Sequence, residues 1–433
     1  CGTTITLGAS GDSIALASGA SQTGFGRTGT VDWQTSIVTA ASFTAVNGQG
    51  FFVDTSSNAV TANLPAGSVG AIVSFKDYAQ NFGTNALTIA ANGSEKIQNL
   101  TTDLVLDTDG QGVTLVYGDA TKGWQAVNSN EIINAIKFVT ASGGTVTTVC
   151  TNFKVHTFTG PGSFCVSCGG SSAGSNTVSY MVVGGGGSGG PRNHASGGGA
   201  GGFREGRTST CSYSVSPLNA PAGLPVTAQA YPITVGSGGS APPCTGGVGV
   251  QGSNSIFSTI TSAGGGGAAS GDQSPASNGG SGGGMRSTCG TSYEGSGNTP
   301  PVSPPQGNDG GAIPGSANNP AYGGGGGGGA TAVGGAGLPS NAGAGGAGAT
   351  TSINGTPTAR AGGGGGSKYA PAGGAGGAGG TGGGGAGGAN AGSNAVSGTT
   401  NTGGGGGGAE RSTPSALGGN GGSGIVIIRY KFQ

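Results

Sequence analysis

Glycine decides what the second half of this chain can fold into. Between Gly184 and Gly424, unbroken runs such as Gly323–Gly329, Gly362–Gly366 and Gly403–Gly408 follow one another with few apolar residues between them. Glycine loses more backbone entropy on folding than any other residue, so such a segment stays disordered unless backbone interactions compensate. An apolar core cannot be the main organiser here, because hydrophobic residues are only 33% of the chain.

The clearest repeat in this region has a period of three. Gly373–Thr381 places alanine or threonine at every third position between pairs of glycines. This period fits polyproline II geometry, a helix of about three residues per turn with no internal hydrogen bonds. Without Cβ atoms, such helices can lie close enough to bond one another through N–H and C=O groups. The repeat therefore predicts a bundle of packed polyglycine II helices. The alternative is a flexible glycine and serine linker, but the length and the aromatic and cysteine interruptions favour order.

Charge and hydropathy exclude several classes of function. The 15 basic residues balance the 15 acidic ones, so no excess of positive charge marks a surface for nucleic acid or an anionic membrane. No apolar run approaches the roughly 20 residues of a membrane span, and no signal-peptide core is present. We expect no nucleic-acid partner, no membrane insertion and a soluble product that works outside the cell. Cys1 could be a lipidated cysteine, but we expect the sequence to start at an internal point of a longer chain.

Cysteine usage gives no firm metal site. Cys165-Val-Ser-Cys168 has the spacing of a zinc or redox pair, but structural zinc needs a second pair of ligands and the other cysteines are single. Disulfides that brace long loops are the favoured alternative in an oxidising medium, with a connectivity that the sequence leaves open. We predict no metal and no cofactor.

The first third of the chain has the pattern of a β-domain. Residues 1–30 alternate apolar and small polar residues around glycine turns, which suits a β-stem in which several chains wrap together. Residues 31–128 contain short strands separated by turn signals, which predicts a β-sandwich or barrel-like module. The expected strands are Gly50–Asp54, Ala59–Leu64, Ala71–Phe75, Ala86–Ala90, Asp103–Leu106 and Gly112–Tyr117. Trp33 and Trp124 are expected to close its core, and Lys76-Asp77-Tyr78 is interpreted as a strand end with one ion pair rather than a site.

Residues 129–154 are interpreted as a linker and residues 155–433 as the glycine-rich domain. Ser129–Phe138 has the only helix-like pattern and is expected to be a linker helix or an extra strand. Further strands are expected at Thr145–Val149, Phe153–Thr159, Ser163–Ser167, Val178–Val183, Ser209–Val215, Gln229–Val235, Ser255–Ser262 and Gly424–Phe432. Val178–Val183 and Ile425–Tyr430 both adjoin glycine and lack another obvious partner, so we expect them to pair in a small sheet that closes the domain. The fold class is mostly β.

No motif indicates catalysis. The two matches to GxSxG, Gly186–Gly190 and Gly279–Gly283, lack the strand, turn and helix that a nucleophile elbow needs, and chance explains them in a chain with 106 glycines. His156 is expected in a strand and His194 in a loop. Carboxylates are too few to suggest an acid pair. We expect a protein that is not an enzyme.

The order of several short motifs resembles a known family. Phe158–Phe164, Tyr180–Gly187, Gly201–Arg204, Ile233–Gly236 and Gly424–Tyr430 are similar to the glycine-rich domain of bacteriophage tail-fibre proteins, notably those of marine phages. The resemblance covers roughly Val155 to the C-terminus, and the preceding β-domain is similar to modules found in such fibres. The seven cysteines and the stretch Met285–Asn319 depart from the pattern.

The resemblance implies a structural virion protein, a tail-fibre subunit and adhesin located extracellularly on the virion. It implies polyglycine II packing, other virion tail proteins as partners, and a host-surface glycan or outer-membrane protein as receptor. Independently, the strand edges and apolar faces of Cys1–Asn128 predict a homotrimer. The alternatives are an ice-binding protein, which a flat face of regularly spaced threonines would favour, and a glycine-rich cell-surface filament. The sequence names neither host nor receptor.

Binding is expected in the interruptions, because a glycine lattice offers almost no side chains. The largest interruption is Met285–Asn319, expected to be a long surface loop whose prolines limit the entropy lost on binding. Its candidate receptor-contact residues are Arg286, Tyr293, Glu294, Asn298 and Asn308. The alternative is that this loop merely covers an edge of the bundle, with Cys289 bonded to Cys244 or Cys211.

Overall fold

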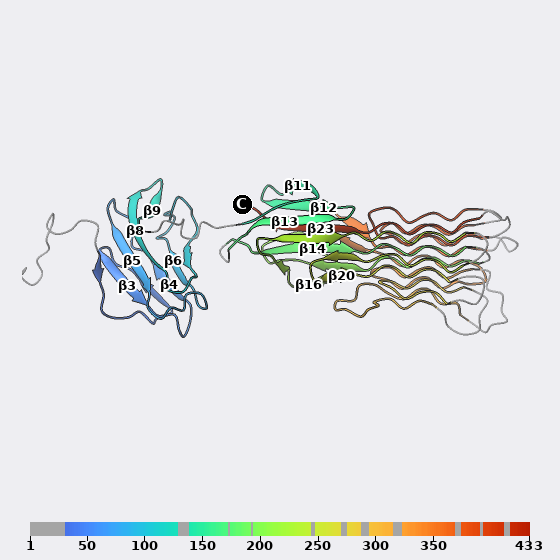
Figure 1. The fold of residues 1–433 in the computed structure, drawn as a ribbon, viewed down its shortest axis with the longest axis horizontal. Coiled ribbons are helices and arrows are strands. Elements are labelled where there is room, and N and C mark those ends of the chain that lie inside the picture. Colours follow the sequence, from blue (N-terminus) through green and yellow to red (C-terminus); the bar gives the residue numbers. More distant parts are fainter. Residues whose placement is uncertain are drawn as a thin grey trace, which may run out of the picture. The chain divides into compact units, whose positions relative to one another are not determined.

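The computed structural model folds into two compact units, Cys1–Ala135 and Ile136–Gln433, and all its regular elements are β-strands in the described residues (Figure 1). The expected stem 1–30 lies outside the described residues, as does the helix-like stretch up to residue 137. The structure describes residues 31–128, 138–171, 174–191, 194–243, 247–269, 275–286, 294–314, 323–368, 374–389, 393–410 and 416–433.

Two sheets make up the first unit. One has the strand order β1-β3-β5-β8-β9 and the other β2-β4-β6-β7. The six strands predicted between Gly50 and Tyr117 are confirmed, and β1, β2 and β9 are additional. The strands are β1 (Asp32–Trp33), β2 (Ser42–Thr44), β3 (Gln49–Val53), β4 (Val60–Asn63), β5 (Ile72–Asp77), β6 (Leu87–Ala90), β7 (Leu104–Leu106), β8 (Gly112–Asp119) and β9 (Gly123–Ala126).

The chain alternates between these two sheets, which makes their first pairings parallel. β3 pairs with β5 and β4 pairs with β6, both in parallel, because each strand is followed by one in the opposite sheet. One hydrophobic cluster fills the space between the sheets, with fully buried side chains from each, such as Phe75 and Leu87. The predicted sandwich-like packing is therefore present, and neither sheet closes into a barrel.

The two tryptophans have different environments. Trp124 is fully buried and its indole N–H donates to Glu95 Oε2 at 3.3 Å. Trp33 is 42% exposed and packs on Phe52 with ring centroids 4.9 Å apart. The prediction that Trp33 closes the core is wrong, because β1 is an edge strand and the indole lies over Gly50 on the outer face of the sheet.

Most strands of the second unit form two larger sheets. One has the order β11-β12-β23-β14-β15-β16, with β17 beside β14, and the other β10-β13-β18-β19-β20. A short hairpin, β21 and β22, stands apart. The strands are β10 (Val139–Ser142), β11 (Thr145–Val149), β12 (Phe153–Phe158), β13 (Gly162–Gly169), β14 (Thr177–Val183), β15 (Phe203–Gly206), β16 (Asn219–Ala220), β17 (Leu224–Pro225), β18 (Ala230–Thr234), β19 (Ser255–Phe257), β20 (Ile260–Ser262), β21 (Ala349–Thr351), β22 (Thr358–Arg360) and β23 (Ile425–Lys431).

The closing sheet predicted from the two apolar strands is confirmed. β14 pairs antiparallel with β23, with Val183 opposite Ile425 and Ser179 opposite Arg429. Both strands are buried on both faces, since alternate residues enter two different hydrophobic clusters. Val182 and Ile428 face the cluster shared with the second sheet. This double burial explains why the last strand is apolar at nearly every position.

Three expectations about this unit need correction. The interval 129–154, interpreted as a linker, contains β10, which pairs with β13, whereas the strand expected at Thr145–Val149 is confirmed as β11 and pairs with β12. Ser255–Ser262 is a hairpin, not one strand. Ser209–Val215 is not a strand, because its backbone bonds elsewhere: the Ser212 carbonyl accepts from the Arg429 guanidinium and the Ser214 carbonyl from the Ser352 amide.

Candidate functional site

The described glycine-rich segments between Gly184 and Gly424 bond to one another through their backbones, and we call them the glycine lattice. In Gly197–Gly202, residues three apart donate to the same neighbour. The amides of Gly198 and Gly201 donate to the carbonyls of Gly406 and Gly403, both at 2.8 Å. Gly199 and Gly202 donate to a second segment at residues 263–266, and Gly197 and Ala200 to a third at residues 325–328. The direction of hydrogen bonding therefore turns by a third of a circle at each residue.

The carbonyl groups of the same segment contact three further neighbours. Gly198 O accepts from Gly364, Gly199 O from Gly187 and Ala200 O from Ser281, at 2.8–3.0 Å. One segment thus bonds to six others, which is how buried N–H and C=O groups are satisfied without a sheet. Figure 1 shows these segments running side by side away from the sheets of this unit.

Glycine is required in the lattice because the backbones are too close for a side chain. A Cβ added at Gly198 would lie 2.2 Å from the carbonyl oxygen of Gly187, and one at Gly405 would lie 2.0 Å from that of Gly198. Small residues occupy the few places with room, such as Ala200 and Ser188, both fully buried. The Ser188 hydroxyl accepts from the Val250 amide at 2.8 Å.

The lattice has two distinct ends. At one end, which we call the sheet end, its segments continue into β14, β15 and β23, and Gly184 donates to Gly202. At the other, which we call the outer end, the chain repeatedly turns back. Gly190 bonds to Ser196 and Ala409, and Ser367 bonds to Ala195. The connections that follow residues 190, 269, 286, 368, 389 and 410 all leave from this level.

The structure does not bring the candidate receptor-contact residues together. Arg286 follows Met285, whose amide bonds to Gly311, and lies at the outer end with half-buried Glu294. Asn298 belongs to the sheet end, where its amide N–H donates to Gly280 and its side chain holds the turn to Val302. Tyr293 lies outside the described residues.

The side chain of Asn308 is hydrogen-bonded within the lattice. Its side-chain amide donates to the carbonyls of Gly329 and Ala330 at 3.1 and 3.0 Å. The expectation that Met285–Asn319 is one surface loop is wrong, because Gly295 and Gly310 within it are buried lattice residues. The prolines suggested a loop along the whole stretch. In the structure, the proline-rich part is a turn, which lies at the sheet end between two lattice segments.

Charged side chains gather at the outer end, and sequence reasoning named only Arg286 among them and missed Lys368 and Glu410. Lys368 and Glu410 are buried to 1% and 0% exposure, and Arg286 to 8%. Burial lowers the pKa of the Lys368 ammonium, and the Glu410 carboxylate opposes part of that shift. Each of these residues follows a glycine run and one small or apolar residue. A charged residue at that position after such a run was the sequence signal that could have located them.

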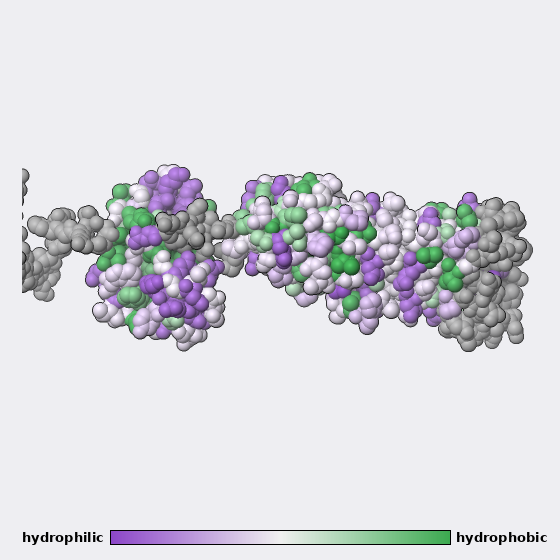
Figure 2. Space-filling view, viewed as in Figure 1, coloured by the Kyte–Doolittle hydropathy of each residue, from purple (hydrophilic) through white to green (hydrophobic). Residues whose placement is uncertain are grey.

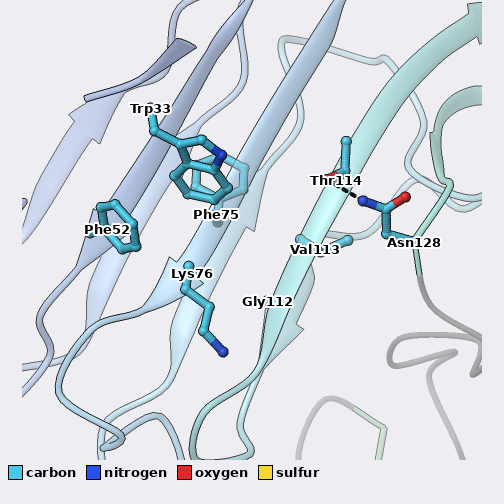
Figure 3. Close-up of a pocket in the computed structure, with 8 residues that line it drawn as sticks. All are labelled: Trp33, Phe52, Phe75, Lys76, Gly112, Val113, Thr114 and Asn128. Atoms are coloured by element: carbon cyan, nitrogen blue, oxygen red, sulfur yellow. Dashed lines mark hydrogen bonds between the residues drawn. The ribbon is translucent and has the colours of Figure 1, made fainter. Parts of the chain in front are cut away.

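A second candidate lies in the first unit, on the outer face of the five-stranded sheet. It is a groove of about 230 Å³ lined by Trp33, Phe52, Phe75, Lys76, Gly112, Val113, Thr114 and Asn128. Figure 3 shows the rings of Trp33 and Phe52 on one side of it and a hydrogen-bonded Thr114–Asn128 pair on the other, and the side chain of Phe75 is buried in the core. Lys76 lies between the two sides, and its ammonium group donates to the carbonyl of Gly110.

The stretch Lys76-Asp77-Tyr78 does not contain the expected ion pair between neighbours. Lys76 is exposed, whereas Asp77 is buried on the opposite face of β5. The Asp77 carboxylate accepts from the amides of Phe82 and Gly110 at 3.2 and 2.9 Å. Asp77 therefore orders the loops after β5 and before β8, which leaves Lys76 to the groove.

The part of the chain that the structure describes contains neither a cluster of metal ligands nor a pair of bonded cysteines. Cys150, Cys165, Cys168 and Cys211 are free thiols, so the CxxC pair is not a disulfide. No group of three or more metal-ligating side chains occurs among the described residues. Nor do these residues include a helix with the length and apolar character of a membrane span.

These features define a class: an all-β protein in which a glycine lattice extends from a pair of packed sheets. The chain belongs to the glycine-rich domain family, whose model matches residues 159–431. The match begins in the turn before β13 and ends at the last residue of β23, so it includes strands β13 to β23 as well as the lattice and leaves out β10 to β12. No curated protein matches the chain significantly.

Proposed function

We propose that this protein is a structural subunit of a bacteriophage tail fibre and acts as an adhesin. In this proposal the glycine lattice is a bundle of polyglycine II helices. The three-residue rotation of its hydrogen bonds supports this geometry, because polyproline II has about three residues per turn. The resemblance of the motifs between Phe158 and Tyr430 to phage fibre domains supports the assignment to a virion.

One observation carries the proposed mode of action. The interior of the lattice is backbone, whereas the connections that leave its outer end carry varied polar, charged and aromatic residues. Figure 2 shows broad pale areas over the glycine segments, which have neither strong apolar nor strong polar character. Such a surface offers little for recognition. We therefore assign receptor contact to the connections at the outer end, with a host-surface glycan or outer-membrane protein as receptor.

In this proposal the lattice and the connections at its outer end have different roles. The lattice is a rigid support, since nearly every turn of each segment is bonded to several neighbours. In this proposal the connections can change in sequence without disturbing the lattice. This arrangement suits a protein that must keep its shape while its binding surface varies.

The test exchanges one connection. Exchange of all of Met285–Asn319 would remove buried lattice segments, so we limit the change to residues 287–293 and replace them with glycine and serine at equal length. We expect folding to be unchanged and adsorption of particles carrying the altered fibre to host cells to fall about tenfold or more.

The matched control changes an exposed turn at the sheet end. Gly355, Thr356 and Pro357 connect β21 and β22 and are all exposed. Their replacement by Gly-Ser-Ser should leave adsorption unchanged. Equal adsorption by both variants would remove the assignment to residues 287–293. Source-genome neighbours that encode no tail or baseplate protein would argue against the tail fibre itself.

A further inference from the structure

The groove of the first unit has an unusual floor for the outer face of a sheet. Cross-strand register places Trp33, Gly50, Ser74 and Thr114 in one row. The next row on the same face contains Phe52, Lys76 and Gly112. In the first row the middle strands therefore carry small residues beside Trp33, whereas in the second row they carry the larger side chains of Phe52 and Lys76.

The glycines are what keep the groove open. A Cβ at Gly50 would lie 2.7 Å from the indole ring of Trp33, and one at Gly112 would lie 3.1 Å from the side chain of Lys76. Trp33 can therefore lie flat over the sheet, and Lys76 can extend along it. The indole stays 42% exposed even so.

The two sides of the groove differ in chemistry. Trp33 and Phe52 have ring centroids 4.9 Å apart, and Tyr78, which is 54% exposed, continues this aromatic side with its ring centroid 6.5 Å from that of Phe52. On the other side Asn128 donates to Thr114, whose hydroxyl also bonds to that of Ser74 at 2.8 Å. The Asn128 carbonyl oxygen and its second N–H remain available for a ligand.

We propose that this groove binds a saccharide with an acidic ring. A sugar ring has an apolar face that an aromatic side chain can cover, and hydroxyl groups at its rim that need hydrogen bonds. The exposed ring of Trp33 and the half-buried ring of Phe52 supply the apolar contact, and Asn128 supplies hydrogen bonds. Lys76 is the one charged residue among those that line the groove, and its ammonium has donors beyond the one bonded to Gly110.

The size of the groove limits the ligand. Its volume of about 230 Å³ lies below the roughly 300–1,000 Å³ of sites for drug-sized molecules. One ring of a longer saccharide fits it better than a whole cofactor. This binding site is separate from the outer end of the glycine lattice and does not depend on the function proposed for that end.

The test uses the fluorescence of the full-length chain. Its two tryptophans are Trp33 and Trp124, and Trp124 is fully buried, so acrylamide quenching reports on Trp33. We would titrate three matched pairs of trisaccharides, built from glucose, galactose or mannose and from the corresponding uronic acids. At least one acidic member should protect Trp33 from acrylamide and bind more tightly than its neutral counterpart.

Variants assign the contacts by calorimetric titration with the same saccharides. Trp33→Ala should weaken binding about tenfold or more, whereas Trp33→Phe should retain part of the affinity. Lys76→Gln should abolish the preference for the acidic member and keep binding of the ring. Val69→Ala, which changes an 81% exposed residue outside the groove, is the matched control and should bind as the wild type does.

Three results would overturn the proposal. One is that no saccharide of the panel protects Trp33, and another is that Trp33→Ala and Val69→Ala bind equally well. The third is a Trp33 that is shielded in the free protein and becomes quenchable only when an oligomer dissociates. That outcome would assign the groove to a contact between copies of the chain.

Discussion

At the scale of single residues, two glycines differ in whether a residue with a Cβ atom can replace them. Gly198 is enclosed by backbone, with the Gly187 oxygen 2.2 Å from where a Cβ would stand, whereas nothing lies within 4 Å of the same position at Gly160. The difference lies in the atoms that surround each glycine. It explains why glycine content alone does not indicate where glycine is essential.

This contrast predicts the effect of two alanine substitutions. Gly198→Ala should destabilise the second unit by about 1–3 kcal/mol or more, because backbone on both sides must shift. Gly160→Ala should be neutral or slightly stabilising, since it mainly restricts the unfolded chain. Urea denaturation followed by circular dichroism measures both. Equal stability of the two variants would contradict the close packing described for the lattice.

His156 is a buried titratable group with defined partners. Its Nδ1 lies 2.7 Å from the carbonyl oxygen of Gly143, which can only accept, so Nδ1 carries the proton. Its Nε2 accepts from the Tyr430 hydroxyl at 3.1 Å. Burial lowers the pKa of His156 below its ordinary 6.5, and Lys154 acts in the same direction, against the hydrogen bond to Gly143.

The direction of this shift predicts a loss of stability in acid. Below about pH 6.5 the unfolded chain takes up a proton that the folded His156 resists, so stability falls as the pH drops towards the lower folded pKa. His156→Gln should lower stability at neutral pH by about 1–3 kcal/mol, because buried hydrogen bonds are disturbed. It should also reduce the loss between about pH 7.5 and about pH 5. An identical pH dependence in both proteins would exclude His156 as its source.

At the scale of elements, β23 holds the second unit together. It lies between β12 and β14 and pairs with both, although it is the last strand in sequence and they come hundreds of residues earlier. Its alternate side chains enter both hydrophobic clusters of this unit. Arg429, 1% exposed, stacks on Phe153 and Tyr213. The strand thus connects the two ends of the glycine-rich region.

Deletion of Ile425–Gln433 should therefore unfold far more than the deleted strand. We expect loss of hydrogen-exchange protection in β12 and β14 and in the lattice near Gly184, because β14 would lose its central partner. Deletion of the exposed Gln433 alone is the control and should leave protection unchanged. Fraying limited to the residues next to the cut would show that the lattice is stable without its closing strand.

At the scale of the whole molecule, the two units follow different folding principles. The first has a conventional apolar core between two sheets. The second combines such a core with a lattice whose buried contacts are hydrogen bonds between backbones. Each unit contains its own hydrophobic clusters, so we expect each to fold without the other.

Homotrimer formation by Cys1–Asn128 remains a prediction at this scale. The edge strands β1 and β2 are short and largely exposed, and a second or third copy could cover such edges. Light scattering of the fragment at micromolar concentration should give the mass of a trimer. A monomer under these conditions would contradict the prediction and leave the full-length chain without an assembly domain in this region.

The sequence by itself determined the element types and much of their position. Short runs separated by turn signals located β3 to β8, and the two apolar strands beside glycine identified the pair β14 and β23. Glycine runs likewise indicated close backbone packing. These features are local, so residue order alone is enough to predict them.

Apart from the pair β14 and β23, only the tertiary structure decided which segments meet. The parallel pairing of β3 with β5, the exposure of Trp33 and the placement of Asn298 and Arg286 at opposite ends of the lattice all depend on contacts between residues distant in sequence. The glycine runs are too alike to specify their six neighbours, so the register is set by the sheets at one end. The groove beneath Trp33 likewise exists only where three strands, β3, β5 and β8, bring small residues together, and no single strand carries that pattern.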